Sequence, residues 1–385
     1  MIVGVIGSGT MGAGIAQVAA TAGCGVILFD ADTQALERSQ TNLEKILNRL
    51  IEKGKYTEAK KAEITGRISY VENIQEMANV NLVIEAIVEN PEIKKSVFET
   101  VEGLVSDECI IASNTSSLSI TSLAAVLKRP ERFIGIHFFN PAPLMKLVEI
   151  VPAIQTSAEV MQHAKEMIDT WGKLTVIAKD TPGFIVNRVA RPFYSEAIRI
   201  YEEGIAGIAT IDWAMKEIGG FRMGPFELMD FIGHDVNYTV SETVFKSFFY
   251  DVRYRPSFTQ KRLVEANYLG RKSGKGFYDY ENPSTDPVPD KNPELASKIV
   301  QRIVVRLINE AADACYLNVA SKEDIDLAMT AGVNYPRGPL AWADDWGLSN
   351  CVNMLDDLYD QYHEGQYRCT VLLRKMVERN ESFFN

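Results

Sequence analysis

The chain has 385 residues, 46% hydrophobic and 24% charged, which is typical of a globular enzyme and long enough for two or three domains. Its net charge of −11 argues against nucleic acid as a partner, because no basic stripe is present to neutralise phosphates. The five cysteines never form a C-x-x-C pair, which favours a reducing compartment over a disulfide framework. Without a recognisable targeting segment or membrane span, we expect a cytoplasmic protein that does not bind membranes.

The first thirty residues have the pattern of a dinucleotide-binding site. An apolar strand from Met1 to Ile6 precedes the turn Gly7-Ser8-Gly9-Thr10-Met11-Gly12, a helix from Thr10 to Ala22 and a second strand, Val26 to Phe29. Gly7 permits the tight turn, Gly9 lets the backbone approach a pyrophosphate, and Gly12 allows close packing of helix on strand. The helix N-terminus, at Thr10 and Met11, then directs free N–H groups at the phosphates.

Asp30 closes the second strand and predicts which nucleotide binds. It lies near the spacing of about 20 residues expected for an acid that hydrogen-bonds the ribose hydroxyls. A 2′-phosphate would meet this negative charge, and the next three residues, Ala31-Asp32-Thr33, supply no cation to receive it. The sequence therefore favours NAD over NADP.

Two helices are expected after Asp30, the first from Gln34 to about Glu52 and the second ending near Ile64. Their outer faces carry lysine and arginine side chains, at positions 45, 49, 53, 60 and 61. The pair is either a solvated surface or a basic arm that holds a phosphorylated substrate tail.

Strand patterns then alternate with helical ones, at 68–71, 82–87, 109–113 and 132–139. This alternation indicates a parallel sheet covered on both faces, with ligands at the carboxyl ends of its strands. Polar groups follow three of these strands, at Glu85–Asn90, Asn114–Ser117 and His137–Asn140.

His137 is the candidate general acid/base. It ends an apolar strand, and the turn Pro141-Ala142-Pro143 sends the chain back through a second strand, Lys146 to Val151. That hairpin can bring Glu149 beside His137, where a carboxylate would fix the imidazole tautomer and raise its basicity. The other histidines, at 163, 234 and 363, fall on expected helices or their ends without a comparable carboxylate-bearing return strand.

A further helix is expected to open at Asp180-Thr181-Pro182-Gly183, where a capping residue stands just before a proline. Asn187 falls one to two turns into this helix. Asparagine is a poor helix former, and by itself this residue indicates no particular role.

Together these motifs resemble the 3-hydroxyacyl-CoA dehydrogenases, including the bacterial 3-hydroxybutyryl-CoA dehydrogenases. The similar segments run in the family's order from residue 1 to about 280. They are Gly7–Ala16, Glu85–Asn90, Ser113–Leu118, His137–Pro141, Lys146–Glu149, Asp180–Arg188, Gly224–Leu228 and Gly274–Tyr278.

The resemblance implies hydride transfer from C3 of a (3S)-3-hydroxyacyl-CoA to NAD, giving a 3-ketoacyl-CoA, or the reverse. It implies His137 as general acid/base oriented by Glu149, with Ser116 and Asn187 hydrogen-bonding near the 3-oxygen and Asn140 completing the pocket. It also assigns Asp30, Glu89, Lys94 and Asn114 to the cofactor, and the basic arm to coenzyme A.

Substrate and pathway stay open at this stage. A short substrate such as 3-hydroxybutyryl-CoA, in β-oxidation or related fatty acid metabolism, is expected, and 3-hydroxyadipyl-CoA of aromatic degradation is the alternative. An inactive NAD-binding structural protein is the alternative of another class. Hydroxyacid dehydrogenases of the phosphogluconate type are disfavoured, because they place a lysine where Asn187 stands.

The C-terminal third repeats the preceding helical region at a constant offset of 114 residues, so that Arg188 matches Arg302 and Gly224-Pro225 matches Gly338-Pro339. The repeat has Gln301 in place of Asn187, which indicates a structural partner. We therefore expect an α/β Rossmann domain followed by two tandem all-α domains. The expected bounds are 1–180, 181–280, a linker at 281–294, and 295–385, in a monomer with an internal pseudo-partner or a homodimer.

Overall fold

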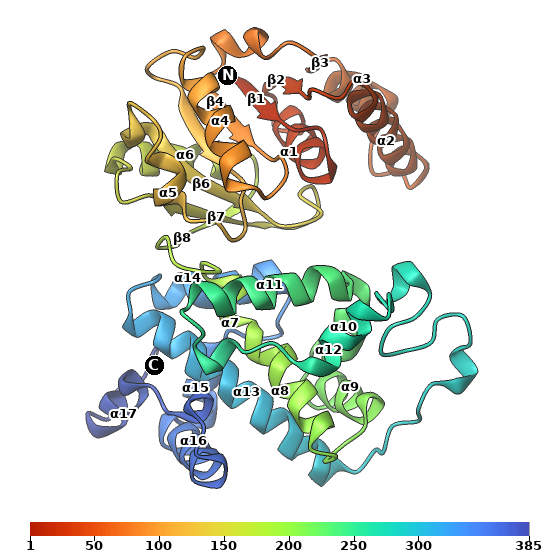
Figure 1. Cartoon of the computed structure of the whole chain (residues 1–385), viewed down its shortest axis with the longest axis vertical. Coiled ribbons are helices and arrows are strands. Elements are labelled where there is room, and N and C mark those ends of the chain that lie inside the picture. The colour runs from red at the N-terminus through yellow and green to blue at the C-terminus, as the bar shows by residue number, and fades with distance from the viewer. Residues whose placement is uncertain (385) are drawn as a thin grey trace. The chain divides into compact units, whose positions relative to one another are not determined.

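The computed structural model describes residues 1–384 of the chain; Asn385 lies outside the described residues. The chain divides into two compact units, Met1–Thr181 and the residues from Pro182 on. Figure 1 shows a sheet flanked by helices in the first unit and a helical assembly in the second.

The first unit is built on one eight-stranded sheet with the order β3-β2-β1-β4-β5-β6-β7-β8. Its pairs are parallel except β6 with β7, which form an antiparallel hairpin. This arrangement confirms the expected Rossmann-like fold and adds a last strand, β8, that the sequence analysis did not predict. The strands are β1 (Ile2–Ile6), β2 (Gly25–Phe29), β3 (Ile68–Val71), β4 (Leu82–Glu85), β5 (Ile110–Ser113), β6 (Phe133–Phe138), β7 (Leu147–Pro152) and β8 (Leu174–Ile177).

Helices cover both faces of this sheet, which explains why its central strands are buried along their whole length. One face carries the main hydrophobic core with α1 (Thr10–Thr21), α2 (Thr33–Glu52), α3 (Glu58–Thr65) and α6 (Ala158–Thr170). On the other face Phe98 of α4 (Pro91–Glu102) packs edge-on against Phe133, and Ile120 of α5 (Ile120–Ala124) packs over Gly135. Because successive strand residues point to opposite faces, a continuous apolar run supplies side chains to the helix layers on both faces of the sheet.

The second unit is mostly helical, with one long segment without an α-helix, at 266–292, that contains isolated bridges near Lys275. Its longest helix, α13, packs against α8, α9 and α15, and runs beside α8 in Figure 1. The helices are α7 (Val186–Val189), α8 (Arg191–Glu202), α9 (Ile208–Glu217), α10 (Pro225–Ile232), α11 (His234–Ser247), α12 (Phe258–Glu265), α13 (Pro293–Tyr316), α14 (Lys322–Val333), α15 (Pro339–Trp346), α16 (Leu348–Tyr362) and α17 (Val371–Glu378).

The prediction that a helix opens at Asp180–Gly183 is wrong. Gly183 and Phe184 have φ values of 75° and 47°, which lie outside the right-handed helical region, so α7 begins only at Val186. The Asp180 carboxylate instead accepts hydrogen bonds from the backbone N–H groups of Ile120, at 3.1 Å, and Thr121, at 2.8 Å. Asp180 therefore stabilises the N-terminus of α5, some 60 residues earlier in the chain.

Candidate active site

The turn between β1 and α1 has no room for a side chain at Gly7 or Gly12 and leaves open space at Gly9, where a dinucleotide backbone would approach. A Cβ atom on Gly12 would lie 1.8 Å from the carbonyl oxygen of Gly7, and Gly7 itself has a φ of 99°. A Cβ on Gly9 would meet nothing within 4 Å. No side chain caps α1 and no acid occupies its first turn, so its N-terminal N–H groups suit a pyrophosphate.

Asp30 follows β2 and is tied to the same turn. One of its carboxylate oxygens accepts hydrogen bonds from the backbone N–H and the hydroxyl of Ser8, at 2.7 and 2.8 Å. The other accepts from the N–H of Asp32, at 3.0 Å. A nearby cation, Arg38, is paired with Asp32 at 3.0 Å, so the negative charge of Asp30 stays available to ribose hydroxyls.

The predicted contact between His137 and Glu149 is confirmed. The antiparallel register of β6 and β7 places the two residues opposite each other, and His137 Nδ1 lies 2.7 Å from Glu149 Oε2. His137 is 5% exposed and Glu149 is fully buried, so water competes little for this hydrogen bond. An Nδ1–H that donates to Glu149 fixes the tautomer in which Nε2 can act as a base.

Buried Lys94 and the more exposed Glu89 form a network of polar contacts at the ends of two strands. The Lys94 ammonium lies 2.5 Å from the Glu85 carboxylate and 3.2 Å from that of Glu89. Glu89 also accepts hydrogen bonds from the Thr115 hydroxyl, at 2.6 Å, and from the Ser116 N–H, at 3.1 Å. Burial raises the pKa of Glu89, but the charge of Lys94 and hydrogen bonds from the Thr115 and Ser117 hydroxyls outweigh it and lower that pKa overall. The network therefore anchors the turn that carries Ser116.

Two hydrogen-bonding residues fix the chain that follows His137. Asn114 accepts a hydrogen bond from the N–H of Phe138, at 2.8 Å, which ties the end of β5 to that of β6. Lys173 donates to the carbonyl oxygens of Ala142 and Met145, at 2.6 and 2.7 Å, and so holds the loop that begins with exposed Asn140. Burial lowers the pKa of Lys173. The sequence analysis missed Lys173, because a lysine just before a strand normally faces solvent.

Asn187 belongs to the second unit and is therefore not among the residues that the first unit brings together. It is the second residue of α7 and is half-buried. Its carbonyl oxygen accepts a hydrogen bond from Arg191 Nε at 2.9 Å. Asn187 therefore lies in the first turn of a four-residue helix, rather than one to two turns into a helix as the sequence predicted.

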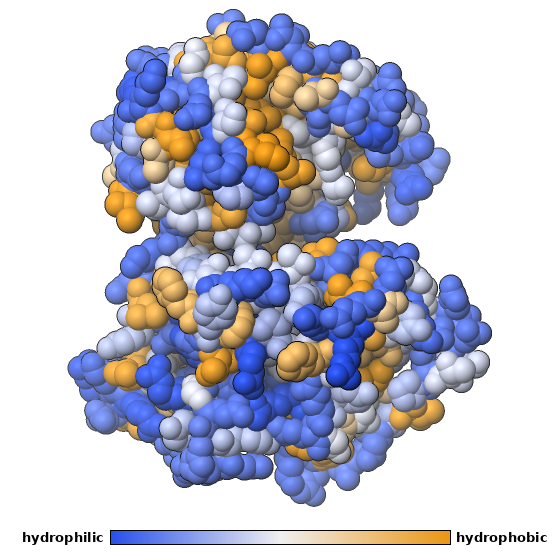
Figure 2. All heavy atoms as spheres, in the orientation of Figure 1, coloured by the Kyte–Doolittle hydropathy of each residue, from blue (hydrophilic) through white to orange (hydrophobic). Residues whose placement is uncertain are grey.

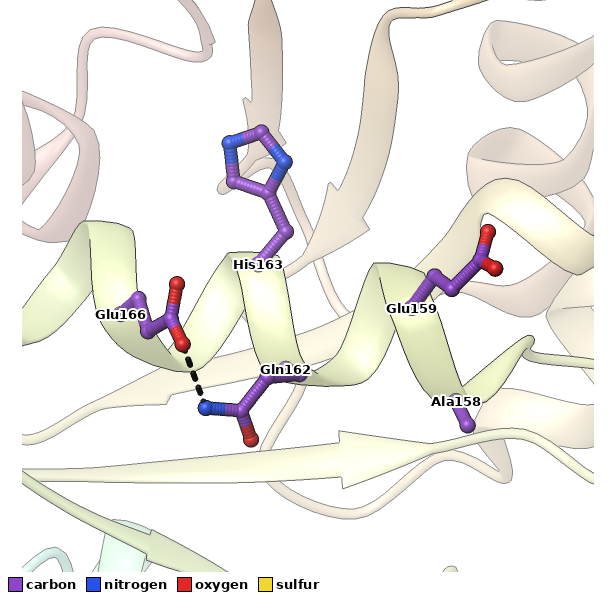
Figure 3. Close-up of a pocket in the computed structure, with 5 residues that line it drawn as sticks. All are labelled: Ala158, Glu159, Gln162, His163 and Glu166. Carbon is purple, nitrogen blue, oxygen red and sulfur yellow. Dashed lines mark hydrogen bonds between the residues drawn. The ribbon is translucent and has the colours of Figure 1, made fainter.

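The remaining histidines occupy other environments. His163 is exposed on α6 and points away from the Gln162–Glu166 hydrogen bond in a shallow hollow lined by that helix alone (Figure 3). His363 ends α16 in a left-handed conformation. His234, however, has a carboxylate partner that the sequence analysis did not foresee, because its Nε2 lies 2.7 Å from Asp230. Both residues are fully buried, so this pair serves the packing of the second unit.

The proposed basic arm corresponds to α2 and α3, whose surface is mostly hydrophilic in Figure 2. Lys45, Arg49 and Lys53 are exposed, whereas the two lysines of α3 have local partners. Lys60 pairs with Glu63 at 3.2 Å, and Lys61 donates to Asn48 at 2.6 Å. Exposed cations on α2 are therefore the part of the arm that an anionic ligand could meet.

Comparison with known families agrees with this geometry. The family "3-hydroxyacyl-CoA dehydrogenase, NAD binding domain" matches residues 2–181. The family "3-hydroxyacyl-CoA dehydrogenase, C-terminal domain" matches residues 183–280 and also residues 299–382. No helix within residues 1–384 is long and apolar enough to cross a membrane.

Individual relatives are similar over most or all of the chain. The 3-hydroxyadipyl-CoA dehydrogenase of Escherichia coli K12 is 38% identical and covers 97% of this chain and 96% of its own length. The probable 3-hydroxybutyryl-CoA dehydrogenase of Deinococcus radiodurans is 45% identical, over 72% of this chain and 99% of its own. A crystal structure of 3-hydroxybutyryl-CoA dehydrogenase from Escherichia coli K12 superimposes with a TM-score of 0.94 at 37% identity, covering 98% of both chains.

Proposed function

Because this chain belongs to the 3-hydroxyacyl-CoA dehydrogenase family, we propose that it oxidises a (3S)-3-hydroxyacyl-CoA to the 3-ketoacyl-CoA with NAD, and catalyses the reverse. The observation that carries the proposal is the buried His137–Glu149 pair in the same unit as the glycine-rich turn. A short substrate such as 3-hydroxybutyryl-CoA is the first candidate, and the reaction belongs to fatty acid or related acyl-CoA metabolism.

NAD bound to this unit would supply the acceptor for the hydride on C3 of the substrate. His137 takes the proton of the 3-hydroxyl group on Nε2, while Glu149 stabilises the imidazolium that results. Ser116 and Asn187 hydrogen-bond the 3-oxygen and its surroundings, where charge changes in the transition state, and Asn140 completes the pocket. The turn from Gly7 to Gly12 holds the pyrophosphate, and Asp30 the ribose, with Glu89, Lys94 and Asn114 beside the cofactor.

The direct test is NADH oxidation in the presence of acetoacetyl-CoA, followed by the loss of NADH absorbance. We expect turnover that requires both substrates. A chain that binds NADH but does not turn over any 3-ketoacyl-CoA would instead be an inactive NAD-binding structural protein.

Asp30 provides a separate prediction about the cofactor. Replacing Asp30 with alanine should weaken NAD binding by roughly 10- to 100-fold, the range of a lost hydrogen bond to a charged group. It should also reduce the difference in KM between NAD and NADP. The measurement is KM for each nucleotide. Glu37→Ala, at an exposed position of α2, is the matched control and should leave the ratio of the two KM values nearly unchanged. A wild-type preference for NADPH would contradict this assignment.

We further propose that residues 295–385 are a second copy of the helical domain at 181–280, joined by the linker at 281–294, after a nucleotide-binding domain at 1–180. The helix positions support this, since α10 and α15 lie 114 residues apart at both ends. In each half an aspartate, Asp212 or Asp326, accepts two backbone hydrogen bonds from the start of that helix, at 2.8–2.9 Å.

Reciprocal ion pairs between the two halves support a pseudo-two-fold arrangement. Arg188 lies 2.8 Å from Glu310, and their equivalents at the same offset, Arg302 and Glu196, lie 2.6 Å apart. Such reciprocity is what a two-fold interface between copies of one domain requires. We propose that the second copy takes the place of a partner subunit, so that the chain is a monomer; a homodimer is the alternative.

A dicarboxylic substrate such as 3-hydroxyadipyl-CoA is the second candidate. It is favoured by the Escherichia coli relative of that name, which aligns with nearly the whole chain, including the second copy. Residence in the cytoplasm also stays a prediction, supported by five cysteines that are all free.

A further inference from the structure

Arg191, the first residue of α8, is a buried cation without a carboxylate partner. It is 6% exposed, its Nε donates to the carbonyl of Asn187 at 2.9 Å, and its Nη1 donates to the Ser241 hydroxyl at 3.1 Å. The ring of Tyr194 lies 5.0 Å from the guanidinium carbon. Within residues 1–384, only neutral groups and tyrosines surround this guanidinium.

The other deeply buried arginines of the second unit are compensated. Arg188 pairs with Glu310 at 2.8 Å, and Arg306 lies 3.5 Å from Glu196. Burying an unpaired charge costs free energy, and at Arg191 this burial lowers the pKa of the guanidinium. An uncompensated cation close to proposed substrate-binding residues therefore indicates a site for an anion.

Tyr335 supplies an unsatisfied hydroxyl donor near Arg191. It is 6% exposed, and its hydroxyl has no hydrogen-bond partner among the described residues. Electrostatic interactions join it to Arg191 and Tyr194, and its ring packs 5.7 Å from that of Phe193. Tyr335 follows α14, which contacts α7, the helix that carries Asn187. A guanidinium without a carboxylate partner and a hydroxyl without a hydrogen-bond acceptor match the chemistry of a carboxylate.

We propose that Arg191 and Tyr335 bind the carboxylate at the far end of the acyl chain, so that dicarboxylic 3-hydroxyacyl-CoAs are preferred. This inference rests on the proposed function and on the contact of Asn187 with the 3-oxygen. Arg191 is four residues after Asn187, about one helical turn, or 5.4 Å. A six-carbon diacid carries its second carboxylate three carbons beyond C3, a comparable span. The second copy would then contribute a specificity residue, rather than serving only as a structural partner.

The test compares two six-carbon substrates, 3-hydroxyadipyl-CoA and 3-hydroxyhexanoyl-CoA, which differ only in the terminal carboxylate. We expect the wild type to favour the adipyl substrate in kcat/KM by at least about tenfold. Arg191→Met should lower kcat/KM for the adipyl substrate by about 10²-fold, the range for truncating one partner of a buried charge pair. The rate with the hexanoyl substrate and KM for NAD should change less than about threefold.

Tyr335→Phe keeps the proposal testable if Arg191→Met does not fold, because it removes only an unpartnered hydroxyl. It should lower the adipyl preference severalfold without affecting the hexanoyl substrate. Arg199→Met, on the same helix but paired with Glu364 at 2.6 Å, is the matched control and should leave the ratio unchanged. The inference would be overturned, with the proposed function intact, by a wild type that oxidises both substrates with equal kcat/KM. It would also be overturned by variants whose kcat/KM falls by the same factor for both substrates. A wild type that oxidises neither would overturn the proposed function as well.

Discussion

Replacing His137 with glutamine should lower kcat by about 10²–10⁴-fold, the range for loss of a general acid/base, while NAD binding stays intact. Glutamine is close to histidine in size, and its amide can still donate to the Glu149 carboxylate, which lies 2.7 Å from His137 Nδ1. The hairpin should therefore keep its geometry. What is lost is the nitrogen that would take the proton of the 3-hydroxyl group.

Two measurements separate a lost base from a damaged fold. NAD binding, followed by quenching of NADH fluorescence, should match the wild type, and the thermal midpoint should shift little. His163→Gln, at an exposed position of α6, is the matched control and should leave kcat unchanged. Near-normal turnover in His137→Gln would show that another group performs the proton transfer.

Truncating the chain near Pro287 should make it dimerise or aggregate, because the cut removes α13 to α17 from a shared core. The buried side chains of Val300, Ile303, Val304 and Leu307 lie on α13, which packs against α7 and α8. On the remaining part, Val186, Val189 and Ala190 would lose this cover. Exposed apolar patches above a few hundred Å² are sites of association.

Charge adds to the effect of this truncation. Arg188, 1% exposed, would lose both of its carboxylate partners, Glu310 at 2.8 Å and Asp313 at 2.9 Å. Removing one partner of a buried ion pair typically costs about 3–5 kcal/mol, so an isolated truncated monomer should be poorly stable. In a dimer of truncated chains, Glu196 of one subunit could meet Arg188 of the other, since Glu196 is the equivalent of Glu310 at the offset of 114 residues.

Light scattering on the truncated and full-length chains, at matched concentrations, measures this outcome. The molar mass of the full-length protein should equal that of one chain, because its first helical region is already covered. The molar mass of the truncated protein should be at least twice that of one truncated chain. A truncated chain that stays monomeric, soluble and fully active would show that the second copy is a dispensable appendage.

Several features could be predicted from the sequence alone because they depend on local patterns. The strands of the Rossmann-like sheet follow from short apolar runs, and the glycine-rich turn from the spacing of Gly7, Gly9 and Gly12. The His137–Glu149 contact is predictable because only 12 residues separate the pair, and the turn between two strands determines their register. The repeat is visible because identical residues recur at one offset.

Other features were decided only by tertiary packing. Asp180 caps a helix 60 residues away, Lys173 holds a loop 31 residues away, and Arg188 meets Glu310 across 122 residues. No periodicity relates such partners, because their approach depends on how complete helices and strands pack. The left-handed Phe184 likewise delays the start of α7, although a proline stands where a helix usually begins. Sequence patterns thus determined most strands of the sheet and their nearest pairings, whereas long-range packing decided which buried charges are compensated and which, like Arg191, are not.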